Sequence, residues 1–169
     1  MKIKKIVKSY DFVISVIISL LVYFIFPCWL NNEMLKDIYG IGISVLSIIF
    51  SVYFAALAII ISSSDDSFVR FLENEGFYQE IVFTFEFTLG SLFVALSYSI
   101  VIYIATSNWI FLKIEIQPIW CFLFFTFLFS YSLIATGQSA LDAIKYAKFR
   151  SKYLGIESGI SSKESNETE

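Results

Sequence analysis

Residues 38–64 read IYGIGISVLSIIFSVYFAALAIIISSS, a run of 27 residues without one charged side chain. An α-helix rises about 1.5 Å per residue, so roughly 20 residues cross the roughly 30 Å of hydrocarbon in a bilayer. This stretch is therefore long enough to span a membrane as a helix. Three further charge-free runs have comparable lengths, at 12–32, 87–112 and 116–141.

The composition of the whole chain agrees with a membrane location. Of the 169 residues, 57% are hydrophobic and 16% are charged, whereas soluble domains average about 45–50% and about 25%. The sequence predicts an all-α bundle of four transmembrane helices, with spans at about 12–32, 38–64, 77–108 and 118–141. We expect the last helix to continue to about residue 154, within a single domain 1–154. Residues 155–169 are rich in Ser and Glu and are predicted to form a disordered acidic tail.

Basic residues are distributed unevenly over the two sides of this predicted bundle. Ten of the twelve Lys and Arg fall on the side of the termini and the 65–76 loop, and only Lys36 and Lys113 fall on the other. Because loops rich in Lys and Arg stay in the cytoplasm, we expect both termini inside a bacterial cell and a multi-pass protein of the inner membrane. Trp29, Trp109 and Trp120 are then expected at the opposite interface, which aromatic rings favour.

Small residues recur along one face of the run at 38–64. Small side chains let helix backbones approach closely, which matters in lipid because no hydrophobic force drives helices together. Packing within one bundle is one alternative for this face, and contact with a second copy in a homo-oligomer, with a tetramer as one form, is the other. The stripe consists of Gly40, Ser44, Ser47, Ser51 and Ala55, and the next span has a similar stripe at Thr84, Thr88, Ser91, Ala95 and Ser99.

Glu86 is the one ionisable residue inside a predicted span. A carboxylate within a membrane must be protonated, hydrogen-bonded, or turned toward water or the bundle interior. One alternative is a hydrogen bond to the last span, at Thr136, Gln138 or Ser139. The other is a ring of Glu86 side chains that lines a cation path in an oligomer.

The two cysteines, Cys28 and Cys121, both fall near the non-cytoplasmic interface, where a bacterium is oxidising. A disulfide between them is one alternative, and two buried thiols are the other. The chain has no His, and two cysteines alone make no metal site, so the usual zinc, His-base and Ser–His–Asp sites are excluded. We expect no catalytic activity and no cofactor. A net charge of −3 also argues against direct binding of nucleic acid.

The predicted extension of the last helix is basic and aromatic. Its basic residues are Lys145, Lys148, Arg150 and Lys152, and its aromatic residues are Tyr146, Phe149 and Tyr153. Arg and aromatic side chains commonly anchor protein contacts, so this surface is predicted to dock a cytosolic effector protein. Anionic lipid headgroups and the acidic 65–76 loop are the alternative partners for the same charges.

The four-span plan with both termini inside resembles the membrane subunit of Kiwa, a bacterial antiphage defence system. The passage FAALAIII at 54–61, which runs directly into the polar residues 62–66, resembles it as well. This resemblance implies a homo-oligomer in the inner membrane that registers phage attack and signals to a cytosolic DNA-binding effector. The predicted function is thus that of a membrane-embedded sensor and anchor. The alternative is an oligomeric pore of the holin, abortive-infection or ion-channel type.

Overall fold

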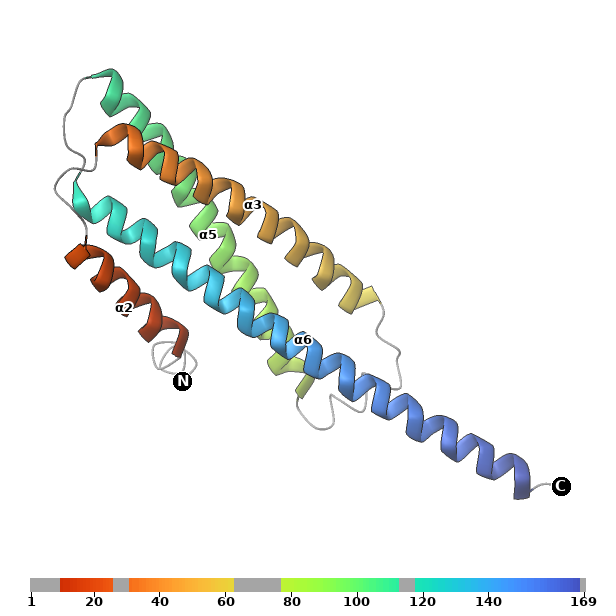
Figure 1. Cartoon of the computed structure of the whole chain (residues 1–169). Helices are drawn as coiled ribbons and strands as arrows, with labels where there is room; N and C mark the ends of the chain where they lie inside the picture. Colours follow the sequence, from red (N-terminus) through yellow and green to blue (C-terminus); the bar gives the residue numbers. More distant parts are fainter. Residues whose placement is uncertain (1–9, 26–30, 63–76, 113–117, 168–169) are drawn as a thin grey trace.

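The computed structural model describes residues 10–25, 31–62, 77–112 and 118–167. These residues form four α-helices and no strand: α2 (Tyr10–Ile25), α3 (Asn32–Ser62), α5 (Phe77–Phe111) and α6 (Ile119–Glu167). Successive helices run in opposite directions along one common axis (Figure 1). The predicted all-α four-helix bundle is confirmed.

Three of the four helices are long and apolar enough to cross a membrane. Their apolar segments are Asn32–Ala58 in α3, Val82–Phe111 in α5 and Ile119–Lys145 in α6. The chain is therefore a multi-pass membrane protein.

The described part of the first helix, α2, overlaps the predicted span at 12–32 as far as Ile25. It has 16 residues, which corresponds to a length of about 24 Å. Residues 26–30, which belong to the same predicted span, lie outside what the structure describes.

The helices pack in a chain of neighbours rather than around one central axis. α3 packs against α5, and α5 packs against α6. The main neighbour of α2 is α6. α2 lies along the first part of α6, on the side away from α3 (Figure 1). At one end of the bundle α3 and α6 begin while α2 and α5 end, and we call this the α3 N-terminal end.

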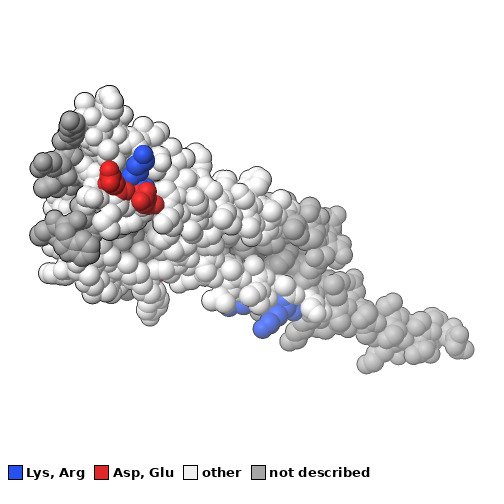
Figure 2. All heavy atoms as spheres, turned by 45° about the horizontal axis from the view of Figure 1, so that its top comes forward, with Lys and Arg blue, Asp and Glu red and all other residues white. Residues whose placement is uncertain are grey.

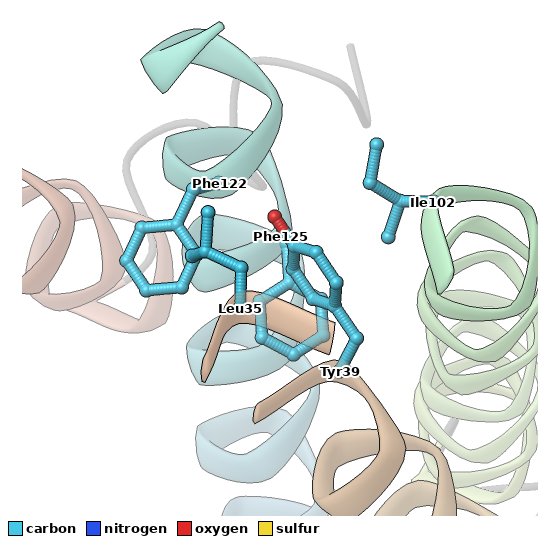
Figure 3. Close-up of a cluster of buried hydrophobic side chains, with 5 residues drawn as sticks. All are labelled: Leu35, Tyr39, Ile102, Phe122 and Phe125. Atoms are coloured by element: carbon cyan, nitrogen blue, oxygen red, sulfur yellow. The ribbon is translucent and has the colours of Figure 1, made fainter. Parts of the chain in front are cut away.

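Aromatic side chains fill the core at the α3 N-terminal end. The Tyr39 ring meets the Phe125 ring edge-on, with 4.8 Å between their centroids. Figure 3 shows these two rings between the helices, with the remaining members of the cluster around them. The cluster joins three helices through Leu35, Tyr39, Ile102, Phe122 and Phe125, and a second one, closer to the other end, consists of Leu46, Tyr53, Phe85, Leu92 and Ala95.

α6 extends far beyond the rest of the bundle (Figure 1). It is one helix of 49 residues, or about 73 Å. The prediction that this helix ends near residue 154 is wrong, because α6 continues to Glu167. The segment 155–167, which was predicted to be disordered, is helical. Gly155 and Gly159 are weak helix formers, but lengthening an existing helix needs no new nucleation. Glycines are therefore tolerated here without ending the helix.

Candidate functional site

The small-residue stripe of α3 lies on the surface of the bundle. The Ser44 hydroxyl donates a hydrogen bond of 3.0 Å to the Gly40 carbonyl, and the Ser51 hydroxyl donates one of 2.9 Å to the Ser47 carbonyl. Both hydroxyls are therefore satisfied by their own helix and contact no other. Ser44, Ser51 and Ala55 are exposed, whereas Gly40 and Ser47 are half-buried. The stripe thus contributes little to packing within one chain.

The similar stripe of α5 has the opposite placement. Thr88, Ala95 and Ser99 are buried between the helices. The Thr88 and Ser139 hydroxyls form a hydrogen bond of 2.7 Å between α5 and α6. This second stripe therefore holds the bundle together from inside.

Glu86 lies on the outer surface of α5. It is exposed, although it follows the start of the apolar segment at Val82 by four residues, or about 6 Å. A Cβ atom added at Gly90, one turn further along, would meet nothing within 4 Å. Of the partners suggested for Glu86 in the last span, Ser139 pairs with Thr88, and the Thr136 hydroxyl donates to the Ser132 carbonyl. The Glu86 side chain therefore points away from the other helices described.

The predicted docking residues all lie in α6, beyond the part that α2 covers. Lys145 and Lys148 are exposed, and Lys145 forms an ion pair of 2.8 Å with Asp142. Such exposed pairs contribute little stability, so the lysines stay available to other partners. In Figure 2 basic side chains lie over α6, away from the charged group at the α3 N-terminal end. The side chains of Tyr146, Phe149, Arg150, Lys152 and Tyr153 are outside what the structure describes.

A groove at the α3 N-terminal end was not anticipated from the sequence. It has a volume of about 570 Å³ and lies between α3 and α5. The Lys36 ammonium lies 5.4 Å from the centre of the Tyr103 ring at its edge, a distance at which a cation is attracted to an aromatic face. Figure 2 shows a small group of acidic and basic side chains at this end of the bundle. The lining residues are Lys36, Asp37, Gly40, Ile41, Ser44, Val45, Ile48 and Tyr103.

Cys121 is a free, half-buried thiol near the start of α6. Its carbonyl accepts a hydrogen bond of 3.0 Å from the Tyr98 hydroxyl. Cys28, Trp29 and the acidic 65–76 loop lie outside the described residues. In the described part of the chain, no three His, Cys, Asp or Glu side chains gather as metal ligands.

No protein-family model, curated protein or solved structure gives a significant match to this chain. The features from which a function can be inferred are therefore the exposed stripe of α3, the outward carboxylate of Glu86, the groove and the long basic helix α6.

Proposed function

We propose that the protein is a membrane-embedded adaptor that transmits changes in its bundle to a cytosolic partner through α6. The observation that carries this proposal is the continuity of that helix. α6 contacts α2, α3 and α5, and it extends 22 residues past Lys145, or about 33 Å. Because α6 is one helix, a shift or rotation of its membrane segment also moves its basic residues beyond the bundle.

Self-association is the second part of the proposal. The exposed small residues of α3 outside the groove, Ser51 and Ala55, would allow a second copy to approach closely. Glu86 supports the same idea, because an ionisable side chain within a span is costly when it faces lipid. Contact with another copy would remove the carboxylate from lipid.

The cellular role that we propose is antiphage defence. The resemblance to the Kiwa membrane subunit motivates it, together with a bacterial inner-membrane location and both termini in the cytoplasm. In this role, membrane disturbance during infection alters the packing of the bundle. The basic residues of α6 beyond the bundle then transmit this change in packing to a cytosolic effector.

The helix as a lever is tested by the substitution Ala147→Pro. Ala147 is exposed, so the change disturbs no core packing. Proline in a helix interior breaks the helix at a cost of about 3 kcal/mol or more, yet every basic residue of α6 is kept. We expect phage plating on cells with the complete locus to show lost protection, with unchanged protein level. Ala147→Ser is the matched control, and full protection by Ala147→Pro would contradict the lever.

The basic surface is tested separately, by reversing Lys145, Lys148 and Lys152 to Glu. We expect the protein encoded beside this one to stop co-purifying. A chain that ends after Gly155 keeps the basic surface and is expected to keep the partner. If a chain that ends after Ala140 still binds the partner, α6 beyond the bundle has no role in docking.

A pore is the second candidate function, and the outward position of Glu86 favours it. In an oligomer this carboxylate would line a path between copies. Glu86→Gln keeps most hydrogen bonds and removes the charge, so it is expected to abolish cation flux into liposomes without changing assembly. Full flux by the Gln variant, together with misassembly of Glu86→Leu, would give the residue a structural role instead.

A further inference from the structure

The groove at the α3 N-terminal end differs from the rest of the membrane-facing surface. It is a shallow hollow along α3 with Tyr103 of α5 at its side, and both charged side chains lie at its end nearest the start of α3. A hollow on a surface within the bilayer is filled by lipid or by protein, because an unfilled void forfeits dispersion contacts. The chemistry of its lining therefore identifies the occupant.

We propose that the groove binds one phospholipid with an ethanolamine headgroup, from the leaflet at the α3 N-terminal end. The Lys36 ammonium would bind the lipid phosphate, and the Asp37 carboxylate would bind the ethanolamine ammonium. These two side chains follow one another in the chain and both line the groove. Their opposite charges match the opposite charges of this headgroup.

The dimensions of the groove suit a single acyl chain. Its lining extends from Lys36 to Ile48 along α3, or about 18 Å. One leaflet contributes about 15 Å of hydrocarbon, half of the roughly 30 Å of the whole bilayer. A lipid held at Lys36 and Asp37 would thus fill the groove to about its far end.

The middle of the groove accepts hydrocarbon because its one serine hydroxyl is already bonded within α3. The Ser44 hydroxyl already donates to the Gly40 carbonyl at 3.0 Å. Gly40 has no side chain to fill the space, and an added Cβ would lie 3.6 Å from the Tyr103 ring. The ring in turn holds the Lys36 ammonium at 5.4 Å from its centre, which orients the charge at the end of the groove.

Other common headgroups match the two charges less well. Phosphatidylglycerol has no cation for Asp37. The quaternary ammonium of phosphatidylcholine has no N–H to donate to a carboxylate. Loss of one favourable charged contact corresponds to about tenfold in affinity.

The test is native mass spectrometry of the full-length protein with added dioleoyl lipids of three headgroups: ethanolamine, glycerol and choline. The wild type is expected to carry about tenfold more of the ethanolamine lipid per protomer than of either other lipid. Ser44→Phe fills the groove and is expected to lower this binding by about tenfold. Ser51→Phe is the matched control, since Ser51 is an exposed serine on the same helix, bonded in the same way, and it is expected to retain the lipid.

The charges are tested by two further variants, which keep the proposal falsifiable if Ser44→Phe does not fold. Asp37→Asn is expected to remove the preference for ethanolamine over glycerol, and Lys36→Met is expected to weaken all three lipids. Equal lipid binding by wild type and Ser44→Phe would overturn the proposal, as would equal loss in Ser51→Phe. If the wild type forms oligomers without lipid and Ser44→Phe converts them to monomers, a second copy occupies the groove. That result would also overturn the proposal.

Discussion

The two small-residue stripes have nearly the same spacing, but one is buried in the bundle and the other lies largely on its surface. On α5, Thr88, Ala95 and Ser99 are at most 2% exposed, whereas Ser44, Ser51 and Ala55 of the α3 stripe face outward. α5 contacts both α3 and α6, and its small face is buried within the bundle. α3 instead turns large side chains inward. A small-residue stripe therefore indicates a surface for close approach and does not identify the neighbour.

The largest effect is expected on the inward face of α3, at Gly42. A Cβ atom added there would lie 2.6 Å from the Phe125 ring, which is itself in the core. Gly42→Leu should lower the free energy of unfolding by about 3 kcal/mol or more, because overpacking forces neighbouring side chains and backbones to move. Denaturation by sodium dodecyl sulfate, followed by circular dichroism, measures the change.

Gly40→Ala is the control for that substitution, two residues away on the same helix. Its added methyl would make only an ordinary contact of 3.6 Å with Tyr103. It should be neutral or slightly stabilising, since alanine favours a helix over glycine by about 1 kcal/mol. Similar losses in both variants would mean that the two positions face the same environment.

The next effect compares the two stripes directly, through Ala95→Leu on α5. Ala95 is 1% exposed, so leucine should cost about 1–3 kcal/mol of unfolding free energy. The same denaturation assay applies. An unchanged stability would show that α5 and α6 can separate at no cost, which contradicts close packing by the buried stripe.

A smaller effect is expected from Thr88→Val, which removes one of the hydrogen bonds between α5 and α6, the one between Thr88 and Ser139. Hydrogen bonds between membrane helices contribute about 0.6 kcal/mol on average, up to about 1.7 kcal/mol, so a loss of about 1 kcal/mol is expected. Thr136→Val is the control, since its hydroxyl donates only to the Ser132 carbonyl of its own helix. Equal losses would remove any special contribution of the Thr88–Ser139 pair.

The smallest effect on stability is expected for Ser51→Leu in the exposed stripe. Ser51 touches no other helix through its hydroxyl, so the unfolding free energy should change by less than about 0.5 kcal/mol. If the stripe contacts a second copy, the same variant should still lower the oligomer mass measured by light scattering in detergent. An unchanged mass would assign this face to lipid.

The sequence by itself determined where most helices run. Long charge-free runs can satisfy their backbone groups in lipid only as helices, so the predicted starts at 77 and 118 lie within one residue of α5 and α6. It placed the start of α3 at 38 rather than at Asn32, and the end of α6 near 154 rather than at Glu167. Both boundaries depend on how well the local residues start or continue a helix. The absence of charge does not measure this.

Only the tertiary structure decided which way each face points. In lipid, an inward and an outward face are equally apolar, because hydrophobicity does not drive the helices together. The pattern around Glu86 or Ser51 therefore could not distinguish a neighbouring helix from the bilayer. The groove depends on tertiary contact as well, since Lys36 and Tyr103 are far apart in the chain and meet only where α3 packs on α5. Shape complementarity between particular side chains made those choices.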